Sequence, residues 1–214
     1  KFLTEIYDFI LLFENSNKDN RGYVRQSIEA KDTCESLKLK NVDFHYEKDK
    51  YIFKNLNLEI KKGDFVGVYG SSGSGKTTLI DLMLGLLKPS RSTDSKGGIF
   101  VNDLEIDKNS EFWREKLAYI PQKIFLINDT IKRNVTVTDD NIVDEDLLNH
   151  SIKSSQLNDL VQSLDEGLNY NVGDDGKKLS GGQRQRLVLA RAIYHEKEFI
   201  IFDYKRSYHI KIFF

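Results

Sequence analysis

The sequence predicts an α/β protein, and three observations carry this prediction. A short apolar run, Phe65–Tyr69, leads through a glycine-rich segment into an apolar stretch with helical character. A second apolar run, Phe199–Phe202, ends at Asp203, which is the pattern of a buried parallel strand. The residues from about 124 to 164 are mostly helical in pattern, with polar faces. We therefore expect a mostly parallel sheet together with a helical subdomain.

The composition is that of a soluble globular protein. Its 214 residues allow one large domain or a domain with an appendage. Hydrophobic residues make up 39% and charged residues 30%, and the net charge of −1 gives no reason to expect a nucleic acid partner. The single cysteine, Cys34, excludes an intrachain disulfide and suits a reducing compartment.

Residues 1–35 differ from the rest of the chain and are expected to form a helix and a linker. Four apolar residues recur at helical spacing, and a polar stretch follows at 15–22. The four are Ile6, Phe9, Ile10 and Phe13. Two interpretations stay open: a surface helix of the domain, or the cytoplasmic end of a preceding transmembrane domain. Because the chain starts at Lys1 and not at methionine, we expect it to be a piece of a longer protein.

Alternating or short apolar runs predict further strands. These segments are 37–46, 56–60, 98–101 and 117–120. Leu79–Leu87 is apolar on most sides and is expected to be a buried helix. The glycine-rich segment therefore lies between a predicted strand and a predicted helix.

That glycine-rich segment has the composition of a phosphate-binding loop. Its sequence is Gly70-Ser71-Ser72-Gly73-Ser74-Gly75-Lys76-Thr77. Glycines let backbone N–H groups converge on one anion, and the following helix adds its positive N-terminal end. Lys76 is expected to reach the β- and γ-phosphates of a nucleotide, and the Thr77 hydroxyl to bind Mg²⁺. The loop alone does not choose among kinases, GTPases, recombinases and transporters, and an incidental glycine-rich turn is the structural alternative.

A second short string precedes a helix at 184–194, and its sequence is Leu179-Ser180-Gly181-Gly182-Gln183. Ser180 at the cap and Gln183 three residues later form a capping box. Gly181 and Gly182 lower helix propensity but leave room for a ligand at the helix start, where an anion is favoured. The alternative is a well-capped helix that binds nothing.

The phosphate loop and this string together resemble the ATP-binding-cassette (ABC) ATPase family, and the resemblance covers about residues 37–203. It implies a phosphate-loop (P-loop) NTPase-type sheet with an antiparallel β subdomain and a helical subdomain. It also implies ATP and Mg²⁺ as cofactors, with nucleotide contacts from Gly70 through Thr78. The resemblance further implies that Ser180 to Gln183 hold the γ-phosphate of a nucleotide bound by a second ATP-binding domain, in a head-to-tail dimer.

Other positions match this family in detail. Tyr46 corresponds to the aromatic residue that stacks on adenine. Gln122 corresponds to the glutamine that contacts Mg²⁺ and its water and moves with the transmembrane partner. Residues 125–135 and Val172–Gly176 resemble segments of exporter-type members. These matches favour an exporter or a lipid-linked-sugar flippase over an importer.

The family pattern breaks directly after Asp203, which would hold Mg²⁺ through water. The next residue should be the glutamate that orients the attacking water, but it is Tyr204, and a phenol with a pKa near ~10 is a poor base at neutral pH. The later loop and histidine of the family do not follow. The resemblance implies catalytic roles for Lys76, Gln122 and Asp203, metal binding by Thr77, Gln122 and Asp203, and impaired hydrolysis.

Residues 204–214 form an aberrant tail in which every second residue from Tyr208 to Phe214 is apolar. A parallel crossover needs about a dozen residues or more, so this tail is too close to Asp203 to supply the missing C-terminal strands by that route. We expect an exposed strand edge and an empty apolar slot, and hence aggregation. A shifted or truncated reading frame and a genuine hydrolysis-dead remnant both stand as explanations.

The sequence thus predicts an ATP-binding domain at 36–203 that belongs to a transporter. At the cytoplasmic face of the cell membrane, it would couple ATP binding and hydrolysis to export or flipping by a transmembrane domain. Two alternatives stay open: a module that dimerises on nucleotide without turnover, and a soluble, non-transport ABC protein of repair or translation.

Overall fold

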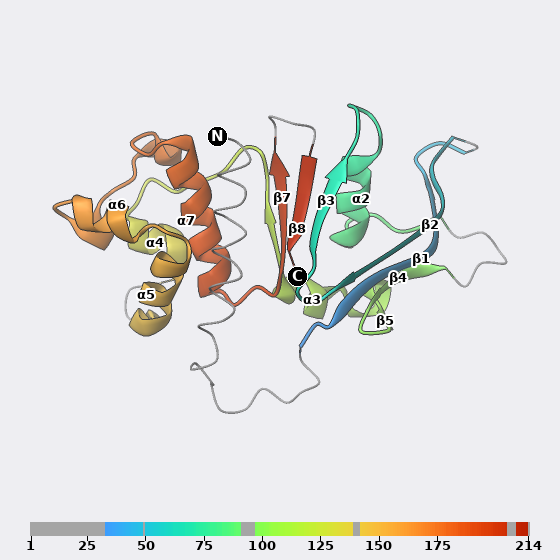
Figure 1. Cartoon of the computed structure of the whole chain (residues 1–214), viewed down its shortest axis with the longest axis horizontal. Helices are drawn as coiled ribbons and strands as arrows, with labels where there is room; N and C mark the ends of the chain where they lie inside the picture. Colours follow the sequence, from blue (N-terminus) through green and yellow to red (C-terminus); the bar gives the residue numbers. More distant parts are fainter. Residues whose placement is uncertain (1–32, 49, 91–96, 139–141, 205–208, 214) are drawn as a thin grey trace. The chain divides into compact units, whose positions relative to one another are not determined.

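The computed structural model of the chain describes residues 33–48, 50–90, 97–138, 142–204 and 209–213 (Figure 1). The helix and linker expected at the N-terminus lie almost entirely outside these residues. The chain forms two compact units. The first, called the sheet unit, comprises Asp32–Gln122 and Lys197–Phe214; the described residues of the second, called the helical unit, lie within Lys123–Glu196. The predicted α/β class is confirmed.

One sheet of the sheet unit is antiparallel, with strand order β2-β1-β4-β5. Its strands are β1 (Ser36–His45), β2 (Tyr51–Lys61), β4 (Gly98–Val101) and β5 (Leu104–Glu105). The alternation seen in the sequence is reproduced in β1, where Leu37, Leu39 and Val42 are buried in the core. This sheet is the antiparallel β subdomain that the sequence predicts.

The other sheet is mixed, with strand order β3-β8-β7-β6. Its strands are β3 (Phe65–Tyr69), β8 (His209–Phe213), β7 (Phe199–Tyr204) and β6 (Leu117–Ile120). Strands β6 and β7 are parallel, whereas β8 is antiparallel to both of its neighbours. It follows that β3, β6 and β7 all point in the same direction, and Figure 1 shows β8 between β3 and β7.

The position of β8 corrects the expectation of an empty slot beside β7. The expectation assumed that only a parallel strand could fill this place. An antiparallel strand returns after a short connection and needs no long crossover, and β8 pairs in this way with both β3 and β7. In the ladder, Ile212 lies opposite Val66 on one side and Ile201 on the other, and its side chain is fully buried. The tail therefore completes the sheet between these two strands.

Two helices of the sheet unit share its hydrophobic core with the strands: α2 (Lys76–Met83) and α3 (Ile106–Lys116). Helix α2 ends before the predicted limit at Leu87, because Gly85 adopts a left-handed conformation with φ 70°. The N–H groups of Gly85 and Leu86 donate to Leu82 and Asp81 at 3.0 and 2.8 Å, which closes the last turn as a Schellman motif.

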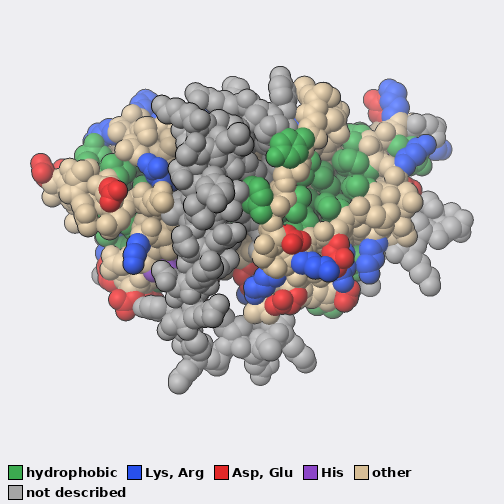
Figure 2. All heavy atoms as spheres, viewed as in Figure 1, with side chains coloured by type: hydrophobic (Ala, Val, Ile, Leu, Met, Phe, Trp, Pro, Cys, Tyr) green, Lys and Arg blue, Asp and Glu red, His purple; other side chains and the backbone are tan. Residues whose placement is uncertain are grey.

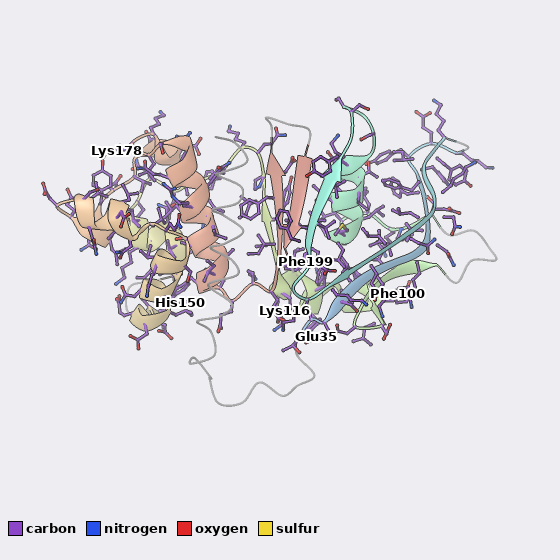
Figure 3. All side chains as sticks on the ribbon, viewed as in Figure 1. Glu35, Phe100, Lys116, His150, Lys178 and Phe199 are labelled. Atoms are coloured by element: carbon purple, nitrogen blue, oxygen red, sulfur yellow. The ribbon has the colours of Figure 1, made fainter. Side chains whose placement is uncertain are left out.

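A buried tryptophan ties α3 to the sheet. The indole N–H of Trp113 donates to the carbonyl of Met83 at 2.6 Å, so the polar atom of this side chain is satisfied. The ring lies 5.1 Å from that of Phe199 at the start of β7, which Figure 3 labels. Figure 2 shows hydrophobic side chains on the visible face of the sheet unit, bordered by charged ones.

The helical unit is built mainly of short helices. They are α4 (Ile131–Thr136), α5 (Glu145–Ser154), α6 (Asn158–Ser163) and α7 (Gly181–Tyr194), together with the 3-10 turns η3 (Gly167–Asn169) and η4 (Asp174–Gly176). Helix α7 packs against α4 and α5 through a buried apolar face that includes Leu187 and Ala190. Within the described ranges, no helix has the length and apolarity that crossing a bilayer requires.

The burial of Ile212 yields a prediction for the tail. Ile212→Ala should lower the free energy of unfolding by about 2–4 kcal/mol, because it removes a buried side chain from the centre of the sheet. Leu104→Ala, at a side chain that is 54% exposed, should change it by less than about 0.5 kcal/mol. Urea titration followed by the fluorescence of Trp113, the single tryptophan, measures both. Equal effects of the two substitutions would contradict the placement of β8.

Candidate functional site

The glycine-rich loop joins β3 to α2 and depends on glycines at two positions. Gly73 and Gly75 have φ angles of 81° and 89°, which side chains rarely allow. Gly75 is the N-cap residue of α2 and offers no side-chain cap. The first backbone N–H groups of α2 therefore have no acceptor from a cap side chain, and this arrangement suits an anion.

The ammonium group of Lys76 lies over the loop. It donates to the carbonyls of Gly70 and Ser71 at 2.7 Å each, and to the hydroxyl of Ser74 at 3.3 Å. A Cβ atom on Gly70 would lie 2.5 Å from that hydroxyl, so a bare backbone is needed there. The lysine thus holds the loop closed on itself and keeps a positive charge at its centre.

Tyr46 and Thr78 connect the end of β1 to the first turn of α2. The Tyr46 hydroxyl lies 3.3 Å from the Thr78 hydroxyl, and the Tyr46 ring packs edge-on against Phe44 with centroids 4.9 Å apart. Tyr46 is 62% exposed, so a face of its ring is open to a planar ligand. Thr77, the preceding residue, is exposed as well.

The loop and Asp203 lie at the same edge of the mixed sheet. In the ladder, Tyr69 at the end of β3 pairs with His209, and His209 pairs with Tyr204 at the end of β7. Because neighbouring strands lie about 4.8 Å apart, the ends of β3 and β7 are about 10 Å apart. The carboxyl ends of parallel strands are where α/β sheets bind ligands, and both predicted elements are found there.

Asp203 accepts hydrogen bonds on both carboxylate oxygens. The amide of Gln122 donates to Oδ1 at 3.4 Å, and the hydroxyl of Tyr119 donates to Oδ2 at 3.3 Å. The structure therefore brings two predicted residues, Gln122 and Asp203, into contact. It also adds Tyr119, which the sequence analysis treated only as part of a strand.

Tyr119 is held in its protonated form by its surroundings. Burial first, and then the negative charge of Asp203, the hydrogen bond to it and the charge of Asp81, together raise the pKa of the Tyr119 phenol to about 12. At neutral pH the phenol is therefore a hydrogen-bond donor and not an anion.

The oxygen atoms that could bind a metal at this edge suit a hard divalent cation. A carboxylate, a hydroxyl and an amide oxygen are the ligand types that Mg²⁺ accepts, usually together with phosphate oxygens and water. Asp203, Thr77 and Gln122 supply these three types. The chemistry of the set thus fits the metal that the sequence predicts.

The second string forms the start of α7 in the helical unit, and the predicted capping box is present. The Ser180 hydroxyl accepts from the N–H of Gln183 at 3.2 Å, and the Gln183 side chain accepts from the N–H of Ser180 at 2.7 Å. Gly181 and Gly182 have ordinary φ angles, and a Cβ on either would meet nothing within 4 Å. Neither backbone conformation nor crowding within the described residues explains the two glycines.

The residues before α4 are fastened to the loop that precedes α7. Thr130 and Asn171 form a β-bridge, and the amide of Asn128 donates to the carboxylate of Asp174 at 2.6 Å. A Cβ on Gly176 would lie 2.5 Å from Leu126. The two segments that the sequence analysis related to exporters are therefore in direct contact within the helical unit.

Comparison with known proteins defines the class of protein. The family model described as "ABC transporter" matches residues 53–204, well over half of the chain. The chain belongs to the ABC transporter family. The resemblance proposed from the sequence is confirmed.

Individual relatives within this family are exporters and flippases. The chain is 35% identical over 170 residues to an ATP-dependent lipid A-core flippase of Ralstonia nicotianae, a match that covers 78% of the chain and 28% of the relative. A flippase of the same name from Cupriavidus pinatubonensis is 34% identical, with the same coverage of both proteins. A solved bacterial Atm1-family ABC exporter with ATP bound has a TM-score of 0.66 and 28% identity, over 80% of this chain and 29% of the exporter. The chain thus spans less than a third of the length of these proteins.

The open space around Gly182 yields a prediction. Gly182→Ala should raise the free energy of unfolding of the helical unit by about 0.5–1 kcal/mol, because alanine favours the helix and meets no obstacle. Gly176→Ala is the control and should destabilise, because Gly176 has a φ of 67° and a crowded Cβ position. Thermal unfolding followed by far-UV circular dichroism measures both variants. Destabilisation by Gly182→Ala would mean that the fold itself requires this glycine.

Proposed function

We propose that this chain is the ATP-binding domain of an ABC exporter or flippase. The observation that carries the proposal is the shared sheet edge, where the loop that follows β3 and Asp203 near the carboxyl end of β7 lie on either side of β8. Membership of the ABC transporter family and the names of the exporter and flippase relatives support it. The domain would lie at 36–203, with residues 1–35 as a helix and linker from a transmembrane domain.

Each part of the site has a proposed task. The loop from Gly70 through Thr78 and the ammonium of Lys76 bind the phosphates of ATP, and the exposed ring of Tyr46 stacks on the base. Ser180 to Gln183 bind the γ-phosphate of a nucleotide held by a second ATP-binding domain. The glycines at the start of α7 leave room for that phosphate, which accounts for residues that the fold does not require.

Thr77, Gln122 and Asp203 are proposed to hold Mg²⁺. When bound with ATP, the ion neutralises charge on the phosphates that develops during phosphoryl transfer. The residues of the chain orient the phosphates. Catalysis in a complete site would come from this positioning and from the charge of Lys76.

Hydrolysis by this chain is proposed to be impaired. A general base typically contributes a factor of about 10²–10⁴ to a rate, and Tyr204 stands where the family has a glutamate. The same substitution favours a second candidate function, a module that dimerises around nucleotide without turnover. In both cases the partners are a second ATP-binding domain and a transmembrane domain at the cytoplasmic face of the membrane, without nucleic acid. The soluble, non-transport alternative is not favoured by the exporter relatives.

Nucleotide binding by the purified chain tests the proposal. We expect MgATP to bind weakly, without turnover above background. Lys76→Ala should weaken this binding by about 10- to 100-fold, because a charge-assisted hydrogen bond to phosphate is worth about 1.5–3 kcal/mol. Isothermal titration calorimetry and a phosphate-release assay measure the two properties. Lys153→Ala, at an exposed lysine of α5, is the matched control.

Two results would overturn parts of this proposal. Absence of nucleotide binding by a folded chain would remove the ATP-binding function. ATP hydrolysis that disappears in Lys76→Ala would show that Tyr204 does not impair the site.

The start of α7 gives a separate prediction about dimers. ATP should promote dimers of the chain, and Gly182→Ala should reduce this effect by about tenfold or more, since a methyl group would occupy the place of a phosphate. Analytical ultracentrifugation with and without MgATP measures the dimer fraction. If the variant dimerises like the original chain, the start of α7 is not the phosphate site.

A further inference from the structure

Two hydrogen-bond donors of different kinds hold the carboxylate of Asp203. Gln122 lies beyond the end of β6, after Pro121, and its side chain is exposed. Tyr119 lies within β6, where the backbone is fixed by its ladder to β7. One donor is therefore carried by a loop and the other by the sheet.

The register of the ladder explains why Tyr119 reaches Asp203. Tyr119 pairs with Ile201, and Asp203 is two residues further along β7. Side chains two residues apart in a strand lie on the same face of the sheet. The phenol thus crosses diagonally to the carboxylate and contacts Oδ2 at 3.3 Å, while Gln122 contacts Oδ1.

We infer that Tyr119 is a positioning residue that sets the orientation of the Asp203 carboxylate toward a nucleotide-bound metal ion. This inference rests on the proposed function, because it concerns the same site. A carboxylate oxygen carries two lone pairs, so Oδ2 accepts from the phenol and still has one for a ligand of the metal. Because the ladder to β7 fixes the backbone of Tyr119, the phenol holds Oδ2 independently of the loop that carries Gln122.

This role has a measurable consequence for metal-dependent binding. Residues that orient a metal-binding carboxylate typically change metal affinity by about 10- to 100-fold. The distance of 3.3 Å is long for an O–H···O bond, which places the expected effect at about tenfold. Binding of nucleotide without metal depends on the loop and Lys76, so it should not change.

The experiment compares ATP binding in Mg²⁺ with ATP binding in excess chelator, by calorimetry on the full chain. Tyr119→Phe keeps the ring and removes only the hydroxyl. We expect about tenfold weaker binding with Mg²⁺ and unchanged binding in chelator. Tyr170→Phe, in the helical unit, is the control and should leave both affinities unchanged. Bound Mn²⁺, observed by electron paramagnetic resonance in the presence of ATP, should fall in parallel in Tyr119→Phe.

The outcomes separate this inference from the proposed function. If the original chain binds no ATP under either condition, the proposed function fails and the inference fails with it. If the chain binds MgATP and Tyr119→Phe binds it equally well, the inference fails while the function stands. An equal loss with and without metal, or loss of folding in Tyr119→Phe, would assign the hydroxyl to the sheet and also overturn the inference.

Discussion

The backbone ladder of β8 is the interaction on which the candidate site depends. Its five residues pair with β3 on one side and with β7 on the other. Without these bonds, the inner edges of both strands would leave buried N–H and C=O groups unpaired, which is costly. The loop follows β3 and Asp203 lies near the carboxyl end of β7, so the register of β8 sets where each stands relative to the other. A slip of one residue would turn Ile212 out of the core, and burial therefore fixes the register.

The direction of β8 matters less for the site than its presence. The site needs β3 and β7 to be parallel and two strand spacings apart, so that their carboxyl ends meet at one edge. An antiparallel strand between them achieves this as well as a parallel one, since two reversals restore the direction. The tail thus supplies the spacing, but it adds nothing to the catalytic role that the sequence analysis expects at position 204. Completing the sheet and completing the chemistry are separate requirements, and β8 meets only the first of them.

The glycines fall into two groups with different physical explanations. Gly73 and Gly75 have positive φ angles, so the shape of the loop itself requires them. Gly181 and Gly182 have neither unusual backbone angles nor neighbours that a methyl group would meet. Helices gain stability when such glycines are replaced, so folding alone gives no reason for them. The proposed phosphate site at the start of α7 would give a reason for both glycines.

Features set by neighbours in sequence could be predicted, and features set by distant pairing could not. The loop, the capping box at Ser180 and the alternation in β1 are local patterns, and the structure reproduces them. The hydrogen bond from Tyr119 to Asp203 joins residues 84 positions apart, and no local pattern indicates it. The place of β8 could be predicted only in part: alternation indicated a strand, but the short distance from Asp203 led to the expectation of an empty slot, although an antiparallel return needs only a short connection. A short connection excludes only a parallel strand at this place. The inner edges of β3 and β7 favour any strand direction that pairs their backbone N–H and C=O groups.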